Sequence, residues 1–122
     1  MKIVVADDDP VARLLIEAIL LSRGHQVISC ADGKSAWDAI SDCGASIVVS
    51  DWMMPGMDGL ELCRRLRSEN HKVYFILVSS TVNSPVRERQ AVEAGVDDVI
   101  LKPAMPDVFS EHMRVAEQLC VA

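Results

Sequence analysis

Short apolar runs alternate five times with longer segments of helical character along this chain. The runs are rich in β-branched and aliphatic residues, a composition typical of strands that are covered on both faces. They lie at about residues 2–6, 25–30, 46–50, 73–79 and 96–101. Regular alternation of strands and helices indicates βαβ units. We therefore expect an α/β fold in which a parallel sheet of five strands has helices on both faces.

Capping and turn residues predict where the intervening helices begin and end. The expected start and stop residues are Asp9 with Pro10 and Gly24, Asp32 with Gly44, Asp58, and Ser84 with Pro85 and Gly95. Apolar residues fall on one face of the first helix, namely Val11, Leu14, Leu15, Ala18 and Ile19. The last helix, from about residue 106 to 120, is expected to turn inward Phe109, Met113, Ala116 and Leu119.

Length and composition suit a single domain, residues 1–122, because half of the residues are hydrophobic and can form a core without disulfides. The formal net charge of −6 argues against direct binding of nucleic acid or of an anionic membrane. No apolar run approaches the ~20 residues of a membrane span, and no signal-peptide pattern is present. We therefore expect a cytoplasmic protein. The four cysteines and three histidines are scattered, which fits reduced thiols and no zinc site.

Charged residues stand at the ends of three apolar runs. Asp7, Asp8 and Asp9 follow the first run, Asp51 follows the third, and Lys102 ends the fifth. In a parallel sheet these ends meet at one edge, where ligands of open α/β sheets bind. Clustered carboxylates repel one another and need a cation, and their oxygens suit Mg²⁺ or Mn²⁺ better than zinc. The alternative is a solvated acidic loop, and Asp9 is expected to be only a helix cap.

The residues around Asp51 suit chemistry on phosphorus. A carboxylate at the end of a buried strand can ligate a metal or act as a nucleophile. Lys102 could pair with Asp51 or with a phosphoryl group placed on it. The hydroxyls of Ser79 and Ser80 could donate hydrogen bonds to an oxyanion. The alternatives are a solvated side chain for the lysine and ordinary helix-entry polarity for the serines.

Four motifs in combination resemble the receiver domain of two-component response regulators, over nearly the whole chain from Lys2 to about Leu119. They are VADDDP at residues 5–10, DWMMPGMDG at 51–59, VSS at 78–80 and AGVDDVILKP at 94–103. The resemblance implies a flavodoxin-like (βα)5 fold with strand order 2-1-3-4-5. It also implies a phosphoacceptor switch that receives its phosphoryl group from a sensor histidine kinase, a phosphotransfer protein or a small phosphodonor. Such a switch would have no enzymatic activity beyond its own phosphorylation and dephosphorylation.

The resemblance assigns a role to each matching position at the charged edge. Asp51 would be the phosphoacceptor. Asp8 and Asp51 would bind Mg²⁺ directly, together with the backbone carbonyl of Met53, while Asp7 would share the metal or hold its water. Lys102 would contact a phosphoryl oxygen. The pKa of Asp51 is expected to be low beside Mg²⁺ and Lys102.

Further roles follow from the same resemblance for the ends of the fourth and fifth strands. The hydroxyl of Ser79 would hydrogen-bond the phosphoryl group, the backbone N–H of Ser80 would assist, and Thr81 would tune dephosphorylation. The Lys102–Pro103 peptide bond is expected to be cis. The output surface would comprise the helix at 84–95, the strand at 96–101 and the last helix. It would bind an output domain or a partner protein, and it could support a phosphorylation-dependent dimer.

The chain departs from the family pattern at Val99, where many receivers carry Tyr or Phe whose ring swings inward on activation. Valine has no ring that could swing inward, so switching must rely on Ser79 and on the segment 80–87. Ser79 itself replaces a commoner Thr, Ser80 a frequent Ala and Ala104 a frequent Phe. An apolar patch is expected from Val82, Val86, Val99 and Ala104, either as a partner surface or as local packing.

Other classes of protein fit less well. A haloacid-dehalogenase-type phosphatase would need a second Asp two residues after Asp51, where this chain has Met53. A flavodoxin-like cofactor binder would need a phosphate cradle after the first strand, and the acidic loop there would repel phosphate. A degenerate receiver that serves only as an interaction module would not need Asp8, Asp51, Ser79 and Lys102. The chain could also be the N-terminal receiver of a longer regulator, such as a cyclic-dinucleotide enzyme.

Overall fold

The computed structural model describes residues 1–80, 84–103 and 105–120, and it confirms the five strand–helix units. In chain order they are β1 (Lys2–Ala6), α1 (Pro10–Ser22), β2 (Gln26–Cys30), α2 (Gly33–Cys43), β3 (Ile47–Asp51), α3 (Gly59–Ser68), β4 (Tyr74–Ser79), α4 (Pro85–Ala94), β5 (Asp98–Leu101) and α5 (Pro106–Cys120). Two boundaries differ from expectation in a way that concerns the site: Asp51 is the last residue of β3, and β5 begins at Asp98. Thr81, Val82 and Ala104 lie outside the described residues.

The strands form a parallel sheet in the order β2-β1-β3-β4-β5, as the resemblance implied. The chain order reverses between β1 and β3, which pair in register from Ile3 opposite Ile47 to Ala6 opposite Ser50. A reversal of this kind opens a crevice at the carboxyl ends of the two strands, because their connections leave toward opposite faces. The carboxylates that follow β1 and end β3 are therefore brought together.

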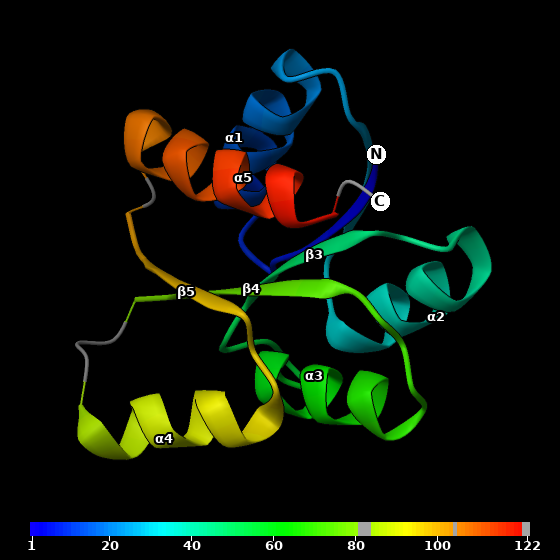
Figure 1. Ribbon diagram of the computed structural model, residues 1–122, viewed down its shortest axis with the longest axis vertical. Coiled ribbons are helices and arrows are strands. Elements are labelled where there is room, and N and C mark those ends of the chain that lie inside the picture. The colour runs from blue at the N-terminus through cyan, green and yellow to red at the C-terminus, as the bar shows by residue number, and fades with distance from the viewer. Residues whose placement is uncertain (81–83, 104, 121–122) are drawn as a thin grey trace.

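Two layers of helices cover the sheet: α1 and α5 lie against one face, and α2, α3 and α4 lie against the other (Figure 1). Successive residues of a strand point to opposite faces. In β1, Ile3 and Val5 accordingly join the core under α1 and α5, whereas Val4 joins the core under α2 and α3. All of β3 and nearly all of β4 are buried, which explains why these strands appear in the sequence as continuous apolar runs.

The predicted helix starts are confirmed. Backbone N–H groups in the first turns of four helices donate hydrogen bonds to the side chains of Asp9, Asp32, Asp58 and Ser84. Gly44 and Gly95 end α2 and α4 in the left-handed conformation that favours glycine. Asp9 thus has the capping role that the sequence predicted for it.

The expected apolar face of α1 is mostly wrong, because of its five residues only Ile19 packs, partly buried, against the core under α1 and α5. Val11, Leu14 and Leu15 are 67%, 65% and 62% exposed, and the buried residues are Ile16 and Leu20. Apolar residues surround most of this helix, so the sequence pattern alone could not show which side packs on the sheet.

The inward face of α5 is predicted correctly for three of its four residues, which are Phe109, Met113 and Ala116. The fourth, Leu119, is 67% exposed. Cys120 takes the next place on the packed face instead, and its side chain is partly buried against the core under α1 and α5. The error therefore lies in the last turn of the helix.

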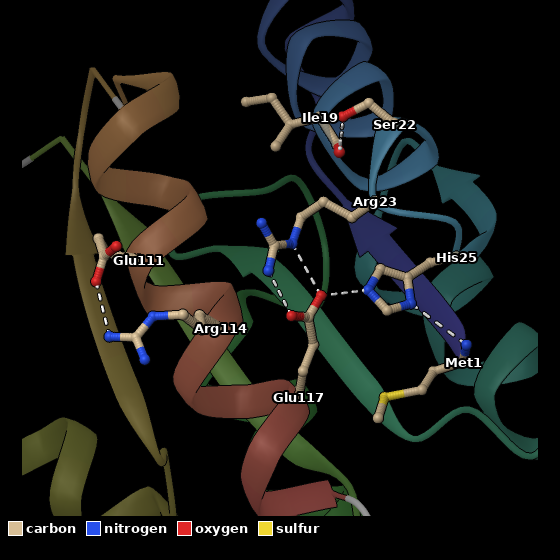
Figure 2. Close-up of polar contacts among 8 residues, drawn as sticks. All are labelled: Met1, Ile19, Ser22, Arg23, His25, Glu111, Arg114 and Glu117. Carbon is tan, nitrogen blue, oxygen red and sulfur yellow. Dashed lines mark hydrogen bonds and ion pairs between the residues drawn. The ribbon is translucent and has the colours of Figure 1, made fainter.

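Glu117 of α5 joins that helix to the end of α1 and to the N-terminus (Figure 2). Its carboxylate accepts hydrogen bonds from Arg23 Nη2 at 2.5 Å and from Arg23 Nε at 2.8 Å, and it lies 2.6 Å from His25 Nε2. The other ring nitrogen of His25 is 3.3 Å from the amino group of Met1. The hydrogen bond from Arg23 is the main reason why the pKa of Glu117 is lowered to about 2.

The cysteines are free, as predicted, and Cys30 and Cys63 are buried. Within the residues that the structure describes, each helix is too short or too polar to cross a membrane.

Candidate functional site

Three carboxylates converge at the carboxyl edge of the sheet. Asp7 follows β1 and is 1% exposed, Asp8 is exposed beside it, and Asp51 ends β3 at 9% exposure. One side-chain oxygen of each lies within 4.8 Å of the others. The juxtaposition predicted from three separate apolar runs is therefore present in the fold.

Lys102 lies between two of these carboxylates. Its Nζ is 3.1 Å from Asp7 Oδ2 and 3.2 Å from Asp51 Oδ2. Its own backbone N–H donates a 2.8 Å hydrogen bond to the carbonyl of Ser79, which ties the end of β5 to the end of β4. The solvated alternative for Lys102 is thereby excluded, because its side chain is only 20% exposed and is paired on two sides.

Asp7 is held at each of its polar groups. Its N–H donates to the carbonyl of Cys30, its carboxylate Oδ1 accepts from the N–H of Asp9 at 2.9 Å, and its Oδ2 faces Lys102. Its backbone carbonyl accepts a 2.7 Å hydrogen bond from Arg13 Nη1. The sequence reasoning missed Arg13, and the signal is weak, because an arginine in the second turn of a helix is ordinarily solvated.

The position of Asp51 is fixed by the backbone around it. Its carbonyl accepts a 2.9 Å hydrogen bond from Ser50 Oγ, and the N–H of Trp52 donates to the carbonyl of Val78 on the neighbouring strand. The chain then turns back, so that Gly59 donates its N–H to the carbonyl of Trp52. A methyl group added at Gly59 would lie 2.3 Å from the carbonyl oxygen of Asp51, so glycine is required at that close approach.

The protein's own residues raise the pKa of Asp51, and the pKa that was expected to be low beside Mg²⁺ and Lys102 stays a prediction for the metal-bound site. Burial raises the pKa of Asp51, the charge of Asp7 raises it further, and these effects outweigh Lys102 and the N–H of Trp52. The expected low pKa is thus not produced by the protein's own residues. For Lys102, burial favours the neutral amine, but the hydrogen bond to Asp7 and the charges of both carboxylates prevail and raise its pKa. Lys102 is therefore a cation shared between two carboxylates, and it compensates the negative charge of Asp51 only in part.

Three further predicted residues follow β3 or lie at the end of β4, and Thr81 lies outside the described residues. Ser79 ends β4 and is buried, one residue beyond Val78, which is opposite Asp51 in the sheet register. Ser80, the next residue, is exposed. The side chain of Met53 is 60% exposed in the loop after β3. The Lys102–Pro103 peptide bond is cis, as expected.

The donor set fits a small hard cation. Three carboxylates within reach of a single point offer the oxygen ligands that Mg²⁺ and Mn²⁺ prefer, while thiols and imidazoles, which zinc prefers, are absent from the described cluster. A divalent ion bound here would supply positive charge beside the shared lysine. The edge of the sheet can therefore gather cationic charge around one ionisable carboxylate, Asp51, which is the arrangement that phosphoryl transfer to a carboxylate needs.

Comparison with known proteins agrees with this geometry. A family model for the response regulator receiver domain matches residues 3–114. The chemotaxis protein CheY1 of Helicobacter pylori strain J99 is 31% identical over 118 residues, which cover 94% of this chain and 95% of that protein. A chemotaxis protein CheY homolog of Campylobacter jejuni is 33% identical over 116 residues, covering 93% of this chain and 89% of that protein.

A solved structure supports the same assignment. The Francisella response regulator 1452 receiver domain matches with a TM-score of 0.90 at 28% identity, with 98% of each chain covered. The chain therefore belongs to the response regulator receiver family, whose members are signalling domains of two-component systems. Both the fold class and the family inferred from the sequence are confirmed.

Proposed function

We propose that this chain is a phosphoacceptor switch in which Asp51 receives the phosphoryl group. The observation that supports the proposal is the placement of Lys102 within 3.2 Å of the Asp51 carboxylate at the edge where Asp7 and Asp8 also converge. Such an edge concentrates negative charge that is only partly compensated, so it favours the binding of a cation and the positioning of a phosphoryl group.

The transfer itself requires little from the protein beyond positioning. An oxygen of the Asp51 carboxylate attacks phosphorus and forms an O–P bond. The bond from phosphorus to the donor breaks at the same centre, and the donor leaves as the imidazole of a histidine kinase or phosphotransfer protein, or as acetate from acetyl phosphate. Lys102 then pairs with a phosphoryl oxygen in place of the carboxylate oxygen that it holds here.

The cation would be held by Asp8, Asp51 and the backbone carbonyl of Met53, with Asp7 sharing the metal or holding its water. We propose Mg²⁺, with Mn²⁺ as a substitute. Bound there, the ion supplies positive charge beside the phosphoryl oxygens. The buried hydroxyl of Ser79 and the N–H of Ser80 would donate to the same oxygens. Thr81, which lies outside the described residues, would tune dephosphorylation.

The surface of α4, β5 and α5 would transmit the phosphorylation signal to an output domain or partner. Large apolar side chains that are exposed on these elements and the segment between them support this choice: Val86, Val92, Leu101, Met105 and Val108. An output domain, a partner protein or a second phosphorylated copy would bind this surface. We propose that residues 1–122 act as one receiver unit in the cytoplasm, where the four free cysteines would stay reduced, and that its catalysis is limited to its own phosphorylation and dephosphorylation.

The test is labelling by acetyl phosphate in the presence of Mg²⁺, read on a phosphate-affinity gel and by mass spectrometry. The parent should take up one phosphoryl group, and Asp51→Asn should take up none. Asp42→Asn, which changes an exposed aspartate on α2, should be labelled like the parent. Labelling of the Asp51→Asn variant at the parent's rate would refute the assignment.

A further inference from the structure

Helix α4 is weakly anchored by burial. Its buried residues are Ala91 and Ala94, whereas α3 of the same length buries four larger side chains, those of Leu60, Leu62, Cys63 and Leu66, besides Gly59. The larger apolar residues of α4, Val86 and Val92, are 67% and 74% exposed. Two methyl groups stabilise little, so other contacts must contribute a large share of what keeps this helix in place.

One such contact joins α4 to the residue after the phosphoacceptor. The guanidinium carbon of Arg87 lies 5.0 Å from the centre of the Trp52 ring, within the range of a cation–π interaction. Trp52 is 7% exposed, its N–H donates a hydrogen bond to the carbonyl of Val78, and its carbonyl accepts one from the N–H of Gly59. The Trp52 ring is therefore fixed in place next to Asp51, and the Arg87 guanidinium packs on it from the first turn of α4.

A cavity leads from this contact toward the output surface. It measures about 430 Å³ and lies between α4 and β5, where Trp52, Ser79, Arg87, Ala91 and Val99 contribute to its walls. Val99 has no ring to fill that space, so α4 has room to move relative to β5. Ser79 and Trp52 both line the cavity, so it borders the residue that directly follows Asp51 in the chain.

We propose that Arg87 is a positioning residue that holds α4 against Trp52, and that phosphorylation of Asp51 releases it. A phosphoryl group adds a charge of about −1.5 to −2 next to Trp52. Guanidinium groups bind phosphate oxygens more strongly than they bind aromatic faces, so Arg87 is drawn off the ring and α4 loses this contact with Trp52. In this chain the Arg87–Trp52 pair thus takes the place of the inward-swinging aromatic residue. The release step rests on the proposed function of Asp51, whereas the anchoring step does not.

The experiment uses the full chain with Trp37→Phe, so that Trp52 is the single tryptophan. Amide hydrogen exchange of the peptide covering 85–94 and Trp52 emission are measured with Mg²⁺, before and after acetyl phosphate. Arg87→Met removes the cation but keeps an apolar stem, and Arg87→Lys keeps the charge. Arg89→Met is the matched control, because Arg89 is an exposed arginine of the same helix.

Before phosphorylation, Arg87→Met should raise α4 exchange about two- to five-fold and shift Trp52 emission, as expected for the loss of a partly exposed cation–π contact. Arg87→Lys and Arg89→Met should stay close to the parent. Phosphorylation should raise α4 exchange in the parent and change it little further in Arg87→Met.

Two results would overturn the proposal: parental α4 exchange in Arg87→Met, or an equal rise in Arg89→Met, which would mean a general loss of helix stability. A parent that takes up no label would refute the role of Asp51 instead, and the comparison of unphosphorylated variants would still decide the anchoring role of Arg87. An Arg87→Met variant that is labelled and responds fully like the parent would refute the release step.

Discussion

The Nζ of Lys102 lies 3.2 Å from Asp51 Oδ2 while it also lies 3.1 Å from Oδ2 of Asp7. One amine therefore compensates two carboxylates that are almost fully buried. The cluster retains excess negative charge even before Asp8 is counted. This excess makes the site depend on an added cation, and it makes the contributions of the individual charges to stability opposite in sign.

Removal of the lysine should be costly. We expect Lys102→Met to lower the free energy of unfolding by about 2 kcal/mol in EDTA, because two buried carboxylates lose their shared cation. Saturating Mg²⁺ should restore part of the loss by supplying charge. Lys34→Met, which breaks an exposed pair with Asp38, should cost less than about 0.5 kcal/mol. Urea unfolding measures both changes, and similar losses in the two variants would contradict the expectation.

Removal of the phosphoacceptor charge should have the opposite effect. The raised pKa of Asp51 means that the folded protein favours its neutral form. This preference stabilises the fold at acid pH and is lost as the pH rises through the pKa of the folded state. We therefore expect Asp51→Asn to be more stable than the parent at pH 7 in EDTA, by about 1 kcal/mol.

The gain in Asp51→Asn should be smaller at about pH 4 than at pH 7, because protonation of the parent carboxylate removes the charge that burial disfavours. Urea unfolding at both pH values measures it, with Asp42→Asn as the control for an exposed carboxylate. A variant less stable than the parent at pH 7 would show that the pairing with Lys102 outweighs burial.

Much of the fold and the centre of the site could be predicted because their signals are local. Each strand is a continuous apolar run, each helix start carries a capping side chain, and Asp7, Asp51 and Lys102 stand at run ends that a parallel sheet must align. The packed side of α1 could not be predicted. Its sequence is apolar on both sides, and the choice of Ile16 over Leu15 depends on the sheet and on α5.

The contacts missed by sequence reasoning depend on how the elements pack against one another. Trp52 and Arg87 belong to different βα units, and nothing near either residue indicates that they meet. Arg13 lies only six residues from Asp7, and its hydrogen bond to the Asp7 carbonyl depends on the turn between β1 and α1. The pKa of Asp51 depends on burial by the whole edge of the sheet, which no motif encodes.

The close approach at Gly59 gives a steric prediction. A methyl group there would meet the carbonyl oxygen of Asp51 at 2.3 Å and the side chain of Leu77 at 2.8 Å. We expect Gly59→Ala to lower the free energy of unfolding by about 2 kcal/mol and to slow labelling, because the backbone of Asp51 must shift.

Gly24→Ala provides the comparison for Gly59→Ala, since a methyl group there meets nothing but the backbone has φ +86°. It should cost about 1 kcal/mol through conformational strain alone and leave labelling unchanged. Thermal unfolding and labelling rates measure both variants. Normal labelling in Gly59→Ala would mean that the loop adapts without moving Asp51.

Magnesium should stabilise the folded protein. Binding to the native state alone adds about 1.4 kcal/mol when the free ion is at ten times its dissociation constant. We expect the melting temperature to rise with Mg²⁺ or Mn²⁺ and not with the same ionic strength of NaCl. The rise should be much smaller in Asp8→Asn, which removes an exposed ligand without disturbing the core. An equal rise in that variant would place the ion elsewhere.

The loss of stability on acidification should depend in part on Glu117, far from the phosphoacceptor. Its pKa falls from 4.5 to about 2 in the folded protein, because Arg23 and His25 bind the carboxylate (Figure 2). A lowered pKa contributes stability that is present above about pH 4.5 and is lost as the pH falls toward 2. We expect Glu117→Gln to be about 2 kcal/mol less stable than the parent at pH 7, with a difference that is smaller at pH 3 and small at pH 2. Glu111→Gln, whose carboxylate is 70% exposed in its pair with Arg114, should follow the parent throughout. Urea unfolding across this range measures the differences, and a gap between Glu117→Gln and the parent that stays constant from pH 7 to pH 2 would exclude Glu117 as the titrating group.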